Sequence, residues 1–198
     1  MNKMDMNNKV GNSAICWSDL TFRVGSGLLK KEKIILQHLY GRFELCAITA
    51  LMGPSGTGKK SLLKCLNGQF SSGLSDNSKI MVNSEVDIVS SFVSQHSKQH
   101  LILCLTVEQN LIYASKLNNS NESDFNHEIN VKNIMCELLL EDISDTVVDN
   151  CSGGQQKRLT IAIEMTPKVK PNVLCIDEPT TGLDSNIAEI VSKNLLYE

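Results

Sequence analysis

The chain has 198 residues, of which 41% are hydrophobic and 21% are charged, so it is large enough to bury a core without disulfides. Its formal net charge of -3 disfavours a general nucleic-acid binder, which usually presents a basic face, and we expect no nucleic-acid partner. The 7 cysteines are dispersed without a C-x-x-C pair, which predicts reduced, buried thiols rather than a redox or metal site. No apolar run approaches the roughly 20 residues that span a bilayer, and residues 1–13 are expected to form a disordered tail without the apolar core of a signal peptide.

Short apolar segments in the first half of the chain predict strands around a glycine-rich loop. Strands are expected at 14–17, 20–24, 34–36, 46–52, 80–82 and 86–93. The run at 46–52 is continuously apolar, as in a buried parallel strand. Leucines at helical spacing after residue 61 predict a helix that Gly68 ends.

The second half of the chain is mainly helical. A helical pattern covers 106–140 with an Asn/Ser-rich interruption at 116–128, and another helix is predicted from Gln155 to Thr166, before Pro167. A buried strand at 172–176 and an amphipathic helix at 186–196 follow. Strands that alternate with helices around a glycine-rich loop indicate an α/β domain with a largely parallel sheet.

The sequence GPSGTGKKS at 53–61, here called the phosphate loop, nearly matches the phosphate-binding pattern G-x-x-x-x-G-K-[ST]. Its residues are Gly53, Pro54, Ser55, Gly56, Thr57, Gly58, Lys59, Lys60 and Ser61. Glycines allow backbone N–H groups to converge on phosphate oxygens at the following helix, and Lys59 would reach the outer phosphates. Lys60 occupies the position of the Mg²⁺-binding hydroxyl, and Ser61 cannot simply replace it because neighbouring helical residues face different directions. A glycine-rich turn without a ligand is the alternative.

Two further motifs carry polar groups beside apolar segments. VLCIDEP at 173–179 places Asp177 and Glu178 at the carboxyl end of a strand, where ligands lie in open α/β sheets. Asp177 would hold Mg²⁺ through water and Glu178 would orient the attacking water, although a solvated strand end has the same pattern. In CSGGQQKRLTIAIE at 151–164, Ser152 and two glycines precede a helix, which fits either an anion site or an ordinary N-cap.

Together, S-G-G-Q-Q, the strand before Asp177 and D-E-P-T-T-G-L-D resemble the nucleotide-binding domain of ATP-binding cassette (ABC) proteins. Gln95 in FVSQ stands at the family's Q-loop position, LTVEQNL follows it at 105–111, and TGLD matches the D-loop. LTFRV, the insert LLKKEK and GGQQKRLTIAIEM are similar to the G, or White-type, half-transporters.

The resemblance implies a P-loop NTPase fold over 14–198, with a RecA-like core at 14–95 and 160–198 and a helical subdomain at 96–159. It also implies two cassettes that dimerise head to tail, with each ATP between the phosphate loop of one and the signature of the other. The residues implied for the partner's ATP site are Ser152, Gly153, Gly154, Gln155 and Asp184. In the chain's own site, Gln95 and Asp177 would serve Mg²⁺, and Gln95 and Glu178 would serve catalysis. Phe22 matches an aromatic position near adenine, with a core strand residue as the alternative.

The chain departs from the family pattern at three places. Lys60 replaces the hydroxyl, and Cys151 replaces an aliphatic residue at the first signature position, a change we expect to be tolerated. All histidines, at 38, 96, 100 and 127, precede Asp184, so none can be the family's switch histidine. We therefore expect that histidine and a transmembrane domain in a longer parent protein, and an ATPase activity that is impaired in this chain.

The resulting hypothesis is a cassette that couples ATP binding and hydrolysis to transport of a lipid-like or apolar compound, at the cytoplasmic face of a membrane. Its partner would be a second cassette, identical or different, with a heterodimer favoured because a homodimer would contain the Lys60 defect twice. A regulatory cassette that binds ATP without hydrolysing it is the first alternative. A soluble ABC ATPase of DNA repair or translation is the second, although no tandem cassette, long coiled coil or basic surface is visible.

Overall fold

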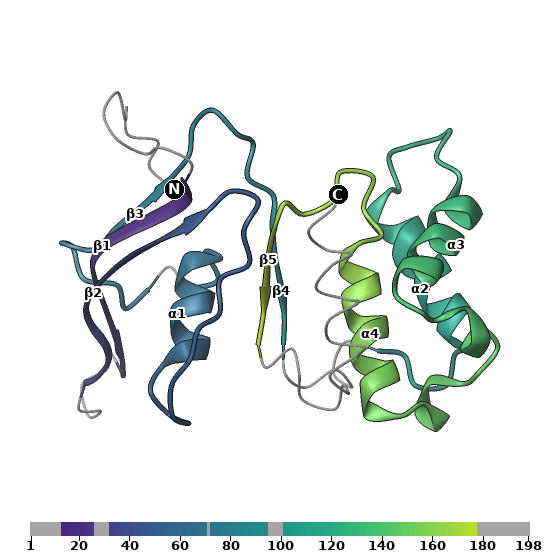
Figure 1. The fold of residues 1–198 in the computed structure, drawn as a ribbon, viewed down its shortest axis with the longest axis horizontal. Coiled ribbons are helices and arrows are strands. Elements are labelled where there is room, and N and C mark those ends of the chain that lie inside the picture. The colour runs from purple at the N-terminus through teal and green to yellow at the C-terminus, as the bar shows by residue number, and fades with distance from the viewer. Residues whose placement is uncertain (1–12, 26–31, 71, 95–100, 178–198) are drawn as a thin grey trace. The chain divides into compact units, whose positions relative to one another are not determined.

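The computed structural model describes residues 13–25, 32–70, 72–94 and 101–177 (Figure 1). The chain divides into two compact units, Met1–Ile88 and Val89–Glu198. The first 12 residues and the predicted helix at 186–196 lie outside the described residues. Within the described ranges, each helix is too short or too polar to cross a membrane.

The first unit is built on an antiparallel sheet with the strand order β2-β1-β3. Its strands are β1 (Ser13–Val24), β2 (Lys33–Glu44) and β3 (Lys79–Val82). The two segments predicted at 14–17 and 20–24 are thus one strand, interrupted by register shifts between Trp17 and Phe22. The inward side chains of this sheet, among them Ile15 and Leu20, are buried together with Leu62 and Leu66 of α1 (Lys59–Leu66). Removal of this apolar surface from water is the main stabilising contribution to the unit.

Helix α1 ends at the position predicted from Gly68. Asn67 is the C-cap, and Gly68 follows in the left-handed region with φ 72°. Its N–H donates to the Cys65 carbonyl at 3.1 Å, and the next N–H, of Gln69, donates to the Lys64 carbonyl at 2.9 Å. These two bonds form a Schellman motif, which satisfies carbonyls that have no partner inside the helix.

The Trp17 ring lies so close to β2 that residue 41 has room only for glycine. The two residues are register partners on neighbouring strands, and a Cβ at Gly41 would lie 2.3 Å from Cζ2 of the Trp17 ring. The indole also packs edge-on against Phe43, with ring centroids 5.0 Å apart, so the ring has little freedom to move aside.

We expect Gly41→Ala to lower the free energy of unfolding by about 1–3 kcal/mol, the usual cost of overpacking. Trp17 is the only tryptophan, so its fluorescence during urea unfolding reports on this unit. Gly153→Ala is the control, because a Cβ there meets nothing within 4 Å. Equal unfolding midpoints for the two variants would contradict the predicted clash.

The prediction of a buried strand at 46–52 is wrong for the described structure. The segment has no regular secondary structure, and Ile48 and Met52 are 58% and 89% exposed. A parallel strand forms only where neighbours satisfy its N–H and C=O groups, and in the described part of the first unit β1, β2 and β3 form an antiparallel sheet that does not include this run. An apolar run indicates that burial is favourable but does not supply the pairing partner.

The second unit combines a parallel strand pair with three helices. The strands β4 (Ser90–Val93) and β5 (Val173–Ile176) pair in parallel, with Phe92 opposite Cys175. The helices α2 (Val107–Asn118), α3 (His127–Glu137) and α4 (Gly153–Glu164) lie side by side in Figure 1. Two short 3₁₀ turns, η2 (Glu141–Ile143) and η3 (Val148–Asn150), connect α3 to α4.

Polar side chains define where the helices of the second unit begin and end. The Thr106 hydroxyl accepts from the Gln109 N–H at 3.2 Å, and Gln109 Oε1 accepts from the Thr106 N–H at 3.0 Å, which forms a capping box for α2. The Asn119 amide donates to the Thr166 carbonyl at 3.0 Å and joins the end of α2 to the end of α4. The predicted helical regions and their interruption are confirmed, with boundaries shifted by a few residues.

The core of this unit contains side chains from all three helices and from both strands. Val107, Leu111, Leu159 and Ile161 are fully buried, and Leu174 and Ile176 pack against the same cluster. This shared core holds α4 against the strand pair. It thereby also fixes the position of the amino end of α4.

Candidate functional site

The phosphate loop in the first unit is an exposed turn whose shape depends on glycine. Gly56 and Gly58 have φ values of 81° and 93°, in the left-handed region that favours glycine. A Cβ at Gly58 would also lie 2.8 Å from Cδ2 of Leu36 and 3.2 Å from the Ile35 carbonyl oxygen. The loop thus approaches β2 too closely for any other residue at this position.

Lys59 is folded back over the loop. Its Nζ donates to the carbonyls of Gly53 at 2.7 Å and Pro54 at 2.9 Å, and the Thr57 hydroxyl also donates to the Pro54 carbonyl at 2.9 Å. These bonds hold a positive charge within the curve of the loop. Phosphate oxygens are stronger acceptors than backbone carbonyls, so a phosphate at this loop would compete for the ammonium.

The start of α1 has the properties of an anion site. Among the described helices longer than one turn, α2, α3 and α4 have a side-chain cap from Thr106, Asn126 or Ser152, but α1 has Gly58 as N-cap and no capping side chain. The first turn of α1 contains no acidic residue, and it begins with two lysines. Cations are unfavourable at the positive end of a helix, by about 0.3–1 kcal/mol each, unless an anion binds there. The exposed N–H groups and both lysines therefore fit a phosphate ligand.

The described residues provide only part of a magnesium site. No group of three or more His, Cys, Asp or Glu side chains that could hold a metal occurs within the described ranges. Mg²⁺ in nucleotide sites is commonly held by one or two carboxylates together with phosphate oxygens and waters, so such a group is not required. Lys60 and Ser61 are both half-buried in the first turn of α1.

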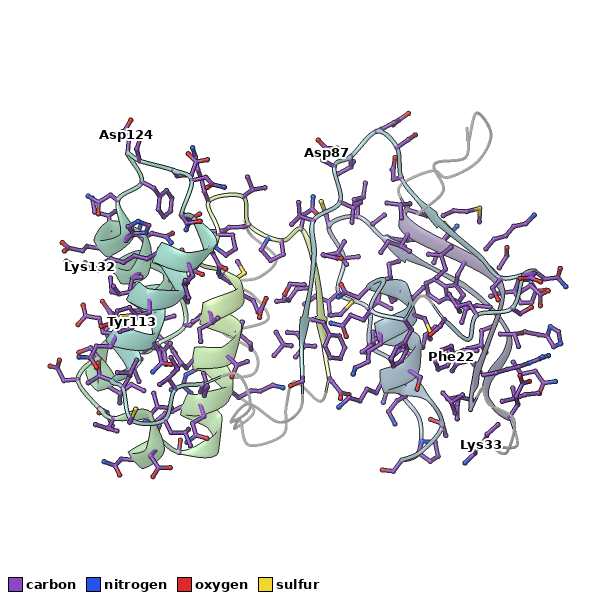
Figure 2. All side chains as sticks on the ribbon, turned by 180° about the vertical axis from the view of Figure 1, so that it is seen from behind. Phe22, Lys33, Asp87, Tyr113, Asp124 and Lys132 are labelled. Carbon is purple, nitrogen blue, oxygen red and sulfur yellow. The ribbon has the colours of Figure 1, made fainter. Side chains whose placement is uncertain are left out.

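Phe22 belongs to the core of the first unit. Its ring, labelled in Figure 2, is 3% exposed. It stacks on Phe70, with ring centroids 4.9 Å apart and planes at 7°. Both rings border a cavity of about 520 Å³ that is also lined by Arg23 and Asp76. A ring that is already stacked and buried offers little surface to adenine, which favours the core alternative that the sequence left open.

Asp177 lies at the carboxyl end of β5 in the second unit. Its N–H donates to the Val93 carbonyl at 2.9 Å, which extends the ladder between β4 and β5 by one residue. The residue is only 8% exposed, so its surroundings are largely shielded from water. Three predicted site residues, Gln95, Glu178 and Asp184, lie outside the described residues.

The signature segment, residues 151–156, is held by two sets of side-chain bonds. Ser152 and Gln155 form a capping box, in which the Ser152 hydroxyl accepts from the Gln155 N–H at 3.3 Å and Gln155 Oε1 accepts from the Ser152 N–H at 2.7 Å. Gln156 is buried and donates to the carbonyls of Val148 at 2.9 Å and Cys151 at 3.2 Å. The Ser152 hydroxyl still has its own proton to donate. The space beside Gly153 is open, because a Cβ built there would meet no atom within 4 Å. The predicted N-cap role of Ser152 thus leaves a donor for an anion.

All seven cysteines are free, and their burial is mixed. Burial raises the pKa of the Cys65 and Cys175 thiols to about 11 and raises the pKa of Cys151 as well, which keeps these thiols protonated at neutral pH. Cys151 packs against the core, in agreement with its replacement of an aliphatic residue. The expectation of buried thiols is wrong for Cys46, Cys104 and Cys136, which are exposed. Dispersed cysteines indicate that no disulfide framework is present, but they do not report burial.

The sequence matches the ABC transporter family over residues 36–181. The chain belongs to the ABC transporter family. Multidrug resistance protein CDR2 of Candida albicans is 35% identical over 187 residues, which cover 89% of this chain and 12% of that protein. ABC transporter G family member 13 of Arabidopsis thaliana is 34% identical over 193 residues, which cover 89% of this chain and 27% of that protein. The chain therefore spans less than a third of the length of these ABC transporters.

Two solved structures show the same fold. CbiO1 from Clostridium perfringens, part of the ABC transporter complex cbiONQ, has a TM-score of 0.70 at 21% identity, over 93% of this chain and 73% of that one. The ATP-binding cassette MJ0796, in a dimeric state bound to ADP and Pi, has a TM-score of 0.72 at 20% identity, over 91% of this chain and 81% of that one. The predicted P-loop NTPase fold of an ABC cassette is confirmed. The G family members among its relatives also confirm the subfamily that the motifs indicated.

Proposed function

We propose that this ABC domain binds ATP at the phosphate loop and acts within a G-type transporter that moves a lipid-like or apolar compound across a membrane. The observation that carries the nucleotide site is the start of α1, where uncapped N–H groups and two lysines meet without an acidic residue. Lys59 and the loop amides bind the phosphates, with Gly53, Gly56 and Gly58 giving the loop its curvature.

Magnesium fits this site less well than phosphate does. The ion would be held by phosphate oxygens, by Asp177 through water and by Gln95, while Lys60 stands where the pattern has its hydroxyl ligand. Bound Mg²⁺ would neutralise charge on the outer phosphates during their transfer. The Lys60 ammonium offsets part of the same phosphate charge without providing a ligand. This arrangement also supports the alternative of a cassette that binds ATP but does not hydrolyse it.

The proposed assembly follows the family pattern. Residues 14–95 and 160–198 would form the RecA-like core, and residues 96–159 the helical subdomain. Two cassettes would pair head to tail, with Ser152, Gly153, Gly154, Gln155 and Asp184 serving the partner's ATP. A transmembrane domain of the parent protein would hold the cassette at the cytoplasmic face of the membrane. The relatedness to G family transporters favours this role over a soluble ATPase of DNA repair or translation.

Calorimetric titration with ATP, once with Mg²⁺ and once with EDTA, tests the proposed site. We expect ATP to bind in both conditions with similar affinity, because Lys60 supplies charge where the metal ligand is missing. Lys60→Ser should restore a preference for Mg²⁺ of roughly tenfold, the lower end of the loss that follows removal of a supporting group from a metal site.

Two further variants complete this test. Lys59→Ala should abolish binding in both conditions, since it removes the ammonium that crosses the loop. Gly41→Ala, whose added Cβ meets the Trp17 ring and not the phosphate loop, is the control for a change in stability alone. Equal Mg²⁺ dependence in the unsubstituted chain and in Lys60→Ser would show that Lys60 does not occupy the place of the ligand, and unchanged affinity in Lys59→Ala would refute the site itself.

A further inference from the structure

Asn110 is a buried polar residue of α2 to which the proposed site gives no role. Its side chain bonds to residues 102–106, which precede α2 and are here called the entry loop. Asn110 is 4% exposed, and its Oδ1 accepts from the Ile102 N–H at 3.0 Å. Its Nδ2 donates to the carbonyls of Ile102 and Thr106, both at 3.0 Å. A buried amide is stable only with such bonds, so Asn110 holds both ends of the entry loop in one shape.

The entry loop is hydrogen-bonded to η3, the turn that precedes the signature segment. The Val148 N–H donates to the Leu105 carbonyl at 3.0 Å. The Asp149 N–H donates to the Leu103 carbonyl at 3.1 Å. Both acceptors belong to the loop that Asn110 holds, so the position of η3 depends on the shape of that loop.

The turn η3 is bonded in the same way to the start of α4. Gln156 donates to the carbonyls of Val148 at 2.9 Å and Cys151 at 3.2 Å, and the Cys151 N–H donates to the Val148 carbonyl at 3.1 Å. The Gln156 side chain, like that of Asn110, is buried. A continuous series of hydrogen bonds therefore runs from Asn110 through the entry loop and η3 to the signature segment.

We propose that Asn110 is a positioning residue for the partner's ATP, which it affects through the signature segment. This inference rests on the proposed function, in which Ser152 and the glycines after it serve the ATP of a second cassette. Apolar packing fixes α4 as a body, whereas hydrogen bonds are directional and set the orientation of individual N–H groups. Donors at a composite site must be in place when ATP arrives, and a displacement of about 1 Å can cost about 10²-fold in rate.

Asn119 provides a matched comparison at the opposite end of α2. It is also 4% exposed, and it too accepts one bond and donates two. Its Oδ1 accepts from the Lys168 N–H at 2.7 Å, and its Nδ2 donates to the carbonyls of Ser115 at 2.8 Å and Thr166 at 3.0 Å. Thr166 lies just beyond the carboxyl end of α4, so Asn119 holds the end of that helix remote from the signature segment.

Hydrogen exchange of the full chain, followed by mass spectrometry, tests the series of bonds. Asn110→Leu has a similar size and removes all three side-chain bonds. The amides of residues 148–155 should then exchange about tenfold faster than in the unsubstituted chain. Asn119→Leu removes as many bonds but should leave these amides unchanged and accelerate exchange at Lys168.

A second variant at the same position covers the case in which Asn110→Leu does not fold, which thermal melting would reveal. Asn110→Ser is milder, but a hydroxyl has only one proton and cannot replace both donated bonds. It should accelerate exchange of the same amides to a smaller extent.

ATP-dependent association of two copies of the chain, measured by analytical ultracentrifugation, tests the consequence for the composite site. ATP between the phosphate loop of one copy and the signature segment of the other should favour association without hydrolysis. Asn110→Leu should weaken this association about tenfold, because the donors are no longer preorganised. ATP affinity in EDTA should stay unchanged, since the phosphate loop belongs to the other unit. Asn119→Leu should associate as the unsubstituted chain does.

The outcomes separate this role from the nucleotide site on which it rests. Unchanged exchange at 148–155 in folded Asn110→Leu or Asn110→Ser would overturn the positioning role, as would unchanged association. Equal effects of Asn119→Leu on these amides or on association would also overturn it, since a general loss of stability would then be the cause. A chain that binds ATP without associating would refute the head-to-tail pairing. A chain that does not bind ATP even in EDTA would refute the proposed function itself.

Discussion

This chain should show little or no release of phosphate from ATP. Lys60 stands in place of the hydroxyl that would bind Mg²⁺. A bound metal acts on charge that develops on the transferred phosphoryl group, and loss of one such interaction typically lowers kcat by about 10²–10³. Phosphate release measured with Mg²⁺ and saturating ATP is the direct test.

The control for this prediction is Glu178→Gln, which removes the carboxylate assigned to the attacking water. If the basal rate is background, this variant should release phosphate at the same rate as the unsubstituted chain. Robust turnover that Glu178→Gln abolishes would instead show that the site is complete without the hydroxyl. Binding of ATP in EDTA, measured in parallel, establishes that a low rate does not come from an unfolded protein.

Local signals in the sequence predicted the parts of the fold that depend on neighbouring residues. Gly68 ends α1 through backbone bonds that span at most five positions, and Ser152 and Gln155 form their capping box within one turn. The strands β1 and β5 and the interruption between α2 and α3 follow from apolar patterning and turn residues in the same way. For these elements, the interactions that decide the structure are between residues that lie close together in the sequence.

The failures concern features that depend on distant residues. The run at 46–52 is as apolar as a buried strand, but pairing partners decide whether a strand forms, and its own residues do not contain that information. Phe22 stacks on Phe70, which lies 48 positions away, and Lys157 donates to the carbonyls of Ser94 and Asp177, which follow two different strands. No periodicity or motif marks such contacts, so they could be recognised only from the structure.

In a full-length parent paired with an intact partner cassette, ATP turnover is expected from only one of the two ATP sites. Each ATP site in a head-to-tail dimer is composite, so Lys60 impairs only the site that contains this phosphate loop. The signature segment of this chain would complete the other site, and its capping box and the Gln156 bonds leave it well ordered. We therefore expect one site that hydrolyses ATP and one that mainly has a structural role. The pair must then be a heterodimer, because a homodimer would contain the Lys60 defect twice.

Two substitutions in this chain locate the active site of the pair. Ser152→Arg should reduce ATP turnover by at least about 10²-fold, because it places a bulky cation where the partner's phosphate would accept a preorganised donor. Lys59→Ala should cost much less, since it damages the site that already lacks its hydroxyl. Turnover of the co-expressed pair, with the same mutations introduced one at a time, measures both effects.

The Ser152 substitution also removes the cap of α4, so its effect needs a matched control. Ser152→Gly is suitable, because glycine at an N-cap costs only a few tenths of a kcal/mol relative to serine and introduces no charge. If Ser152→Gly retains much more turnover than Ser152→Arg, the loss comes from the cation at the phosphate rather than from an unravelled helix. Equal losses from Ser152→Arg and Lys59→Ala, or normal turnover by a homodimer of the parent, would show that both sites hydrolyse ATP and that Lys60 is tolerated within the phosphate loop.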